Sequence, residues 1–323
     1  MINETTVEAC YRALLGRPPE SAAVVERAIR EAGDLEGLLR GFVASPEFAD
    51  RMRREGGEEA RAGRPAIDVD VTDAQRAALF EAVRRQWRTL GETEPFWSVL
   101  THDEYRAANL DAAAKARFYA TGAEHAGLID LFCARTATPP PRGTCLELGC
   151  GVGRMTKHLA GAFQRVIAAD VSEGNLRECR AMAAEAGLAN IEFVLLRSPE
   201  DIAQVKRFDV FVSVITLQHN QPPVQKHLLD QILRRLSPGG VFLFQAQTYY
   251  PGYAFDIEAY LAAPPDTMEM HSLPMCEIMR LIDRRGALAL EVLEDDWTGR
   301  QGSHTFFGTK RARRGWFGGA AGG

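Results

Sequence analysis

The stretch Cys145-Leu-Glu-Leu-Gly-Cys-Gly-Val-Gly-Arg-Met-Thr156 decides the fold. An apolar run that ends at Leu148 predicts a strand, the glycines that follow predict a loop, and a helical pattern begins at Arg154. Glycine tolerates a left-handed backbone and lets a ligand approach closely. A strand, a glycine loop and a helix in this order are typical of nucleotide-binding sites.

The spacing of the glycines narrows the choice of ligand. Gly149, Gly151 and Gly153 alternate, so Arg154 stands where a dinucleotide-binding fingerprint has its third glycine. That glycine allows close packing of helix on strand, and its replacement argues against NAD. The loop also lacks the Gly-Lys-Ser/Thr of a phosphate-binding P-loop. A tight turn without a ligand remains the alternative at this point.

Strands and helices alternate from residue 144 onward. The expected strands are short and almost continuously apolar, as in parallel strands buried on both faces. They cover residues 144–148, 165–170, 191–196, 208–215 and 241–247. The alternation predicts a doubly wound α/β sheet with helices on both faces. Two later strands, 289–294 and 305–310, predict an antiparallel end to the sheet.

Changes in composition divide the chain into five parts. These are a helical module (1–50), a charged, glycine-rich linker (51–70), a helical lid or cap (71–142), the sheet domain (143–310) and a disordered tail (311–323). The lid region holds an aromatic cluster. Its members with polar tips, Trp97, Tyr105 and Tyr119, are expected to cover a small-molecule site.

The N-terminal module carries two short motifs, Tyr-Arg-Ala-Leu-Leu-Gly-Arg-Pro at 11–18 and Phe-Val-Ala-Ser-Pro-Glu-Phe at 42–48. With these motifs it resembles a small all-helical bacterial domain of unknown function. The resemblance implies an association with enzymes that build surface polysaccharides. A module that only aids folding or solubility is the alternative.

Composition excludes several classes of protein. The 323 residues carry a net charge of −5, which gives no general attraction to nucleic acid or to anionic lipid. No apolar run approaches the ~20 residues of a membrane span, and the N-terminus lacks the pattern of a secretory signal. The six cysteines are scattered without Cys-x-x-Cys spacing. We therefore expect a cytoplasmic protein with free thiols, no membrane insertion and no metal site.

Further motifs follow the glycine loop. Asp170 ends the second expected strand about 20 residues past the glycines, where a carboxylate can bind a ribose diol. With Glu147 before the glycines, the segment Phe208–His219 and the turn Leu236–Gly240, the chain resembles class I S-adenosylmethionine-dependent methyltransferases. The match is strong over residues 144–247 and wider over about 95–310. It implies a seven-stranded Rossmann-like sheet, S-adenosylmethionine as cofactor and S-adenosylhomocysteine as product.

The resemblance also implies roles for single residues. Gly149, Cys150 and Gly151 would approach the methionine part of the cofactor, and Glu147 would organise the loop and the amino group. Asp170 would bind the ribose hydroxyls.

Other cofactor contacts are implied at the ends of the next strands. Val171 would pack on adenine, and Ser213 and Tyr119 are also assigned to the cofactor site. Many members of the family bind the adenine amino group with an Asp where this chain reads Arg197-Ser198. Ser198 is the candidate for that contact, and Glu200 is the second.

A hydroxyl acceptor needs a base, and histidine is suited to that role near neutral pH. His219 is the first candidate and His271 the second, and structural hydrogen bonding is the alternative for both. The expected acceptor is a hydroxyl of a glycan, a nucleotide sugar or another small molecule. A different nucleotide-cofactor enzyme, such as an oxidoreductase, and a non-enzymatic scaffold remain the alternatives.

Overall fold

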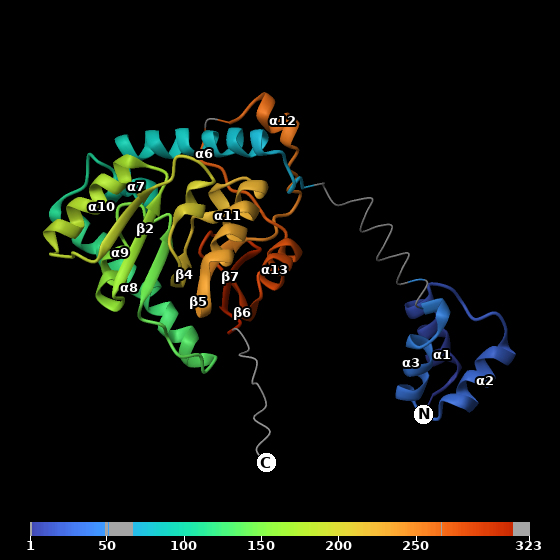
Figure 1. The fold of residues 1–323 in the computed structure, drawn as a ribbon. Helices are drawn as coiled ribbons and strands as arrows, with labels where there is room; N and C mark the ends of the chain where they lie inside the picture. The colour runs from blue at the N-terminus through green and yellow to red at the C-terminus, as the bar shows by residue number, and fades with distance from the viewer. Residues whose placement is uncertain (1, 49–50, 52–66, 266, 313–323) are drawn as a thin grey trace, which may run out of the picture. The chain divides into compact units, whose positions relative to one another are not determined.

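The structure is a computed structural model that describes residues 2–48, 51, 67–265 and 267–312. The chain divides into two compact units, Met1–Pro65 and Ala66–Gly323 (Figure 1). Most of the predicted linker and nearly all of the predicted tail lie outside the described residues. The two units are described separately below.

The first unit is helical, as the sequence predicts. Its helices are α1 (Glu4–Cys10), which continues into a π-helical turn (Tyr11–Leu15), α2 (Ala22–Ala32) and α3 (Leu35–Val43). The Asp34 carboxylate caps α3 by accepting a hydrogen bond from the backbone N–H of Gly37 at 2.7 Å. A small core holds the helices together, formed by Val7, Cys10, Val25, Leu38 and Phe42.

The second unit is built on a seven-stranded sheet with the order β3-β2-β1-β4-β5-β7-β6. The strands are β1 (Thr144–Leu148), β2 (Arg165–Asp170), β3 (Ile191–Leu195), β4 (Phe208–Ser213), β5 (Leu236–Gln247), β6 (Ala287–Asp295) and β7 (Ser303–Lys310). The first five strands are parallel, and β7 pairs antiparallel with both β5 and β6. The predicted α/β class, the strand sequence and the antiparallel end are confirmed.

Helices cover both faces of this sheet (Figure 1). One face carries α8 (Ala112–Arg135), α9 (Thr156–Ala162) and α10 (Glu173–Glu185), and the other carries α11 (Pro222–Arg235) and α13 (Met275–Arg284). Shorter elements connect them: α7 (Pro95–Val99), α12 (Ile257–Ala262) and 3-10 turns at Asp103–Tyr105, Asp201–Gln204 and Leu217–His219.

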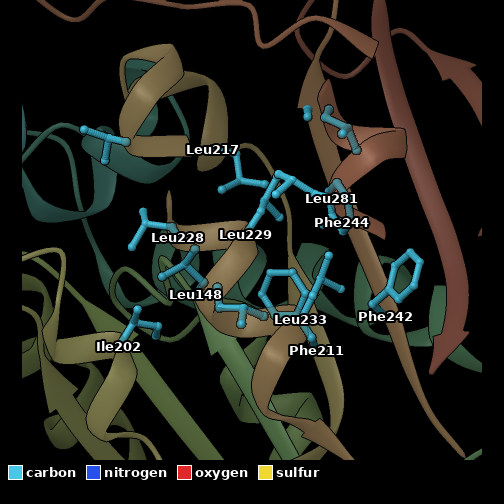
Figure 2. Close-up of a cluster of buried hydrophobic side chains, with 14 of the residues drawn as sticks. Leu148, Ile202, Phe211, Leu217, Leu228, Leu229, Leu233, Phe242, Phe244 and Leu281 are labelled. Carbon is cyan, nitrogen blue, oxygen red and sulfur yellow. The ribbon is translucent and has the colours of Figure 1, made fainter. Parts of the chain in front are cut away.

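Side chains alternate between two core clusters, which explains why the strands read as unbroken apolar runs. On β2, Val166 packs toward α8 and α9, whereas Ile167 packs toward α11 and α13. Figure 2 shows the cluster on the side of α11 and α13. In it, Phe211, Phe242 and Phe244 of the sheet meet Leu229 and Leu233 of α11. Burial on both faces fixes the register of the strands and therefore where each one ends.

A long helix, α6 (Asp73–Thr93), lies across one end of the sheet (Figure 1). The Thr72 hydroxyl accepts a hydrogen bond from the Gln75 N–H, and the Gln75 side chain accepts one from the Thr72 N–H. This reciprocal capping box is the start signal that the sequence shows at residue 72. The buried face of α6 includes Leu79, Phe80 and Val83.

Two local predictions differ from the structure. The helix expected at 124–134 is the second half of α8, because Asp111 caps it with a hydrogen bond to the Ala114 N–H. The stretch expected to be irregular after β5 contains α12, capped by Asp256. In both cases the side chain of one Asp caps the helix and sets its N-terminal boundary. The aromatic residues nearby masked this capping signal in the sequence. No helix within the described residues is long and apolar enough to cross a membrane.

Candidate active site

A cavity of about 330 Å³ opens where β1, β2 and β4 end. The glycine loop and the end of β2 form one wall, and the segment after β4 forms the opposite one. Three further segments contribute side chains: Phe80, Val83 and Trp87 of α6, the stretch Ser98–Thr101, and a group formed by Met268, Met270, Trp297 and Thr298. A cavity at the carboxyl ends of parallel strands is the usual ligand site of a doubly wound sheet.

The glycine loop is shaped by close approach of backbone. Gly149 has φ +74°, and its N–H donates to the Ala169 carbonyl at 2.8 Å. A Cβ at Gly149 would lie 2.2 Å from Cγ2 of Thr216 on the facing segment. Glycine is therefore required both by the backbone conformation and by the neighbour.

Asp170 joins the end of β2 to this loop. One carboxylate oxygen accepts the Gly151 N–H at 2.9 Å, and the other accepts the Ser172 N–H at 2.8 Å. Burial raises the pKa of this carboxyl, and the backbone N–H groups oppose the shift. An ionised carboxylate has about four acceptor positions, so two remain for hydroxyl groups of a ligand.

Glu147 and Arg154 are two buried charged residues in the same wall. The Glu147 carboxylate accepts the Thr156 hydroxyl at 2.6 Å, and burial raises the pKa of Glu147 to about 7. The Arg154 guanidinium contacts the Thr121 carbonyl and Nδ1 of His125, each at 3.3 Å. In the sequence analysis Arg154 served only to exclude NAD, and its place in the cavity wall was not predicted.

His219 lies in the opposite wall with a defined tautomer. Its Nδ1 lies 2.9 Å from the Glu269 carbonyl, which can only accept, so Nδ1 carries the hydrogen of the neutral ring. Burial lowers the pKa of His219 to about 4, so the ring is neutral at pH 7. Nε2 has no hydrogen-bond partner among the described residues, and its lone pair is available to a ligand.

Gln218 is a cavity residue that sequence reasoning missed. The residue belongs to the cavity lining, but its side chain is fully buried, and neither Oε1 nor Nε2 has a partner within the part of the chain described. Leaving a buried donor or acceptor unpaired costs roughly 1–3 kcal/mol per group. The only signal in the sequence was a polar residue at the end of a buried strand.

The predicted cofactor residues fall into two groups. Glu147, Gly149, Cys150, Gly151, Asp170 and Val171 all line the cavity. Ser198 does not, because its hydroxyl and its N–H are both bound by the carboxylate of Asp201. Ser213 does not either, because its hydroxyl donates to the Leu148 carbonyl inside the sheet.

Tyr119 and His271 also lie away from the cavity. The Tyr119 hydroxyl donates to the Val152 carbonyl, and its ring packs on Phe96 and Phe118. His271 is buried behind the segment after β4, with Nδ1 2.9 Å from the Tyr253 hydroxyl. These side chains were aromatic or titratable residues near the expected site, but local packing turned them toward other partners.

The predicted lid is formed by other residues. Tyr105 is buried against Phe118, and the Arg106 guanidinium lies over the ring of Trp97 at 4.3 Å. The aromatic side chains that do line the cavity come from α6 and from the end of the β6–β7 hairpin. Trp87 and Trp297 are the largest of them.

The family comparison agrees with this geometry. Residues 145–240, from β1 into β5, match the family model described as a methyltransferase domain. The sheet unit contains a methyltransferase domain. The matched segment contains the glycine loop, Asp170 and the segment after β4, and it excludes both the N-terminal unit and α6.

Individual relatives are similar over parts of the chain. A ubiquinone biosynthesis O-methyltransferase from Caulobacter vibrioides is 27 % identical over 184 residues, which cover 57 % of this chain and 65 % of that protein. An uncharacterized RNA methyltransferase from Thermosynechococcus vestitus is 30 % identical over 100 residues, 31 % of this chain and 22 % of that protein. The chain thus spans less than two thirds of the length of these curated relatives.

A solved structure with bound S-adenosylhomocysteine is similar over much of the chain. Magnesium protoporphyrin IX methyltransferase from Synechocystis PCC 6803, with S-adenosylhomocysteine, is 15 % identical, with a TM-score of 0.49, over 72 % of this chain and 99 % of that one.

The cavity residues fit the methyltransferase cofactor. Asp170 retains acceptor positions for the two ribose hydroxyls, and the glycine loop presents backbone without side chains. Glu147, once ionised, complements the ammonium group of the methionine part. When bound, the cofactor supplies an electrophilic methyl group on a sulfonium. Within the described residues no group of three or more His, Cys, Asp and Glu side chains could hold a metal ion.

Proposed function

We propose that the protein transfers the methyl group of S-adenosylmethionine to a hydroxyl of a small molecule, such as a glycan, a nucleotide sugar or another compact acceptor. The observation that carries this proposal is His219. Its Nδ1–H is held by the Glu269 carbonyl, and its Nε2 lone pair is free at the wall opposite the glycine loop. A neutral imidazole so placed can take the proton of an acceptor hydroxyl.

The low pKa of His219 suits this role. A hydroxyl oxygen that receives a methyl group becomes strongly acidic as the bond forms, so a weak base is sufficient to remove its proton. A base with a pKa of about 4 is also unprotonated throughout the physiological range. Methyl transfer is an in-line displacement, so most of the acceleration comes from positioning and from exclusion of water. Phe80, Val83 and Trp87 of α6 would supply that apolar cover.

The acceptor side of the cavity favours a flat molecule with polar groups on its edge. Met268, Met270 and Trp297 offer apolar and aromatic surface, and Nε2 of His219 offers an unpaired polar atom. A sugar ring or an aromatic ring stacked on Trp297 meets both requirements. The resemblance of the N-terminal unit to a domain found with polysaccharide enzymes favours a sugar.

Binding experiments separate this proposal from its alternatives. S-adenosylhomocysteine at saturating concentration should raise the melting temperature, whereas NAD should not. Lack of stabilisation by S-adenosylhomocysteine would remove the methyltransferase proposal, and stabilisation by NAD would favour an oxidoreductase. Binding of S-adenosylhomocysteine without turnover on any acceptor would favour a scaffold.

The acceptor is then found by transfer of a radioactive methyl group to fractions of a cell extract. Separate fractions should hold nucleotide sugars, glycans, small aromatic compounds and RNA. Label in the RNA fraction alone would overturn the small-molecule acceptor, and label on nitrogen would overturn the hydroxyl. Label in the nucleotide-sugar or glycan fraction would support the link suggested by the N-terminal unit.

A further inference from the structure

Ile215 has a backbone conformation that its side chain disfavours. Among the described residues only two non-glycine residues have positive φ, Ala137 at +52° and Ile215 at +51°. Ala137 lies in the turn after α8, whereas Ile215 follows β4 and lines the cavity. A β-branched residue in this region is a genuine outlier, and such outliers persist only when their surroundings hold them.

Gln245 of β5 holds this conformation. Its side chain has no exposed surface, and its Oε1 accepts the Ile215 N–H at 3.1 Å. Its Nε2 donates to the Ser303 hydroxyl at 2.8 Å, and that hydroxyl donates to the Asp295 carboxylate. A carboxylate only accepts, so the direction of every bond in this chain is fixed. The Gln245 amide therefore cannot flip, and Oε1 must face Ile215.

Thr216, the residue after Ile215, connects the conformation of Ile215 to the glycine loop. The Thr216 side chain fills the space beside Gly149, where a Cβ would lie 2.2 Å from Thr216 Cγ2. Rotation of the Ile215 peptide would move Thr216 against or away from Gly149. Thr216 can therefore pack against Gly149 in this way only while Ile215 stays in the left-handed region.

We propose that Gln245 is a positioning residue for cofactor binding, which acts by holding Ile215 in its left-handed conformation so that Thr216 packs against Gly149. This inference rests on the proposed function, because it takes S-adenosylhomocysteine as the ligand of the cavity. By this inference, β5 and the β6–β7 hairpin contribute to a site that is formed mainly by β1, β2 and β4.

The test is a double-mutant cycle with S-adenosylhomocysteine as the probe in calorimetry. Gln245→Leu should weaken binding roughly tenfold, because a buried N–H loses its acceptor and Ile215 can leave its conformation. Ile215→Gly removes the disfavoured side chain and should change binding less than about threefold. The double variant should bind within about threefold of Ile215→Gly, because glycine adopts positive φ without help.

Gln247→Leu is the matched control. Gln247 is a buried amide two residues along β5, and its Nε2 donates to the Tyr249 and Gln301 carbonyls. Any loss of affinity in Gln247→Leu should not be rescued by Ile215→Gly. Equal rescue of both variants, or no rescue of Gln245→Leu, overturns the positioning role.

A milder variant covers the case in which Gln245→Leu does not fold. Ser303→Ala removes the acceptor of Nε2 and lets the amide rotate, so it should weaken binding about threefold, again with rescue by Ile215→Gly. Affinity equal to that of the wild type in Ser303→Ala would overturn the inference. Failure of the wild-type protein to bind S-adenosylhomocysteine would instead remove the proposed function.

Discussion

The two walls of the cavity differ in how their polar groups are satisfied. In the wall formed by β1 and β2, both carboxylate oxygens of Asp170 accept backbone N–H groups, and Glu147 accepts the Thr156 hydroxyl. In the wall after β4, the Gln218 amide has no partner within the described chain and His219 has a free Nε2. The first wall is organised before any ligand binds. The second wall leaves the Nε2 lone pair of His219 available to a ligand, and we propose that this wall is the acceptor side.

The largest effect should come from His219→Phe. The ring keeps its packing on Trp87 but loses Nε2, so methyl transfer should fall roughly 10³-fold through loss of the base. Affinity for S-adenosylhomocysteine should stay within about threefold. Rates with the acceptor found in the extract and calorimetry measure the two quantities. In the wild type the rate should show no step from His219 between pH 6 and 8, because its pKa is about 4.

His227→Phe is the matched control for this change. His227 lies on α11 outside the cavity, and its Nε2 is also unpaired among the described residues. It should leave the rate unchanged. A similar loss of rate in both variants would show that the effect comes from the fold and not from a base.

The next largest effect should come from Asp170→Asn, which breaks the wall that is organised in advance. The amide has one acceptor oxygen, so it cannot hold both backbone N–H groups and also bind a diol. Binding of S-adenosylhomocysteine should weaken roughly 100-fold by calorimetry.

Asp201→Asn is the control, because Asp201 also accepts backbone N–H groups after a strand, at Arg197 and Ser198, but lies outside the cavity. It should lower stability without changing affinity. If Asp201→Asn weakened binding as much as Asp170→Asn, the adenine contact would be assigned to the loop that contains Ser198 and Asp201.

A smaller effect should appear as a pH dependence of cofactor binding. The Glu147 carboxyl has a pKa of about 7 in the free protein, and the ligand's ammonium group favours its ionised form. The complex therefore binds fewer protons than the free protein. Affinity for S-adenosylhomocysteine should be constant above pH 7 and should fall as pH decreases below it, by at most tenfold per unit. In Glu147→Gln the affinity should be lower and flat between pH 5.5 and 8.

The smallest effect should come from Gln218→Leu, which sharpens the contrast between the walls. Removing two unpaired buried polar atoms should leave the free protein as stable or more stable, by roughly 1 kcal/mol. The KM for the acceptor and the affinity for S-adenosylhomocysteine should both change little, because the amide is buried. A large loss of thermal stability would contradict the view that Gln218 lacks partners in the free protein.

Local patterns were sufficient for most of the fold. The bounds predicted for β1 and β2 are those of the structure, because an apolar run is a property of adjacent residues. The reach of α8 back to Ala112 was missed, since the aromatic residues in that segment were interpreted as a lid. Trp87, on a helix predicted correctly, lines the cavity instead.

The sequence by itself determined the wall to which we assign cofactor binding. Glu147, Gly149, Gly151 and Asp170 are positioned by one strand, one loop and the end of the next strand, so their spacing is sufficient to assign them. The tertiary structure decided the rest. His219 faces the cavity, whereas Ser213 and His271 do not, because contacts with segments far along the chain set those side-chain directions. Gln245 shows the same principle, since its partners Ile215 and Ser303 lie 30 and 58 residues away. Hydrogen bonds over such separations leave no periodic pattern in a sequence, and only the folded sheet brings them together.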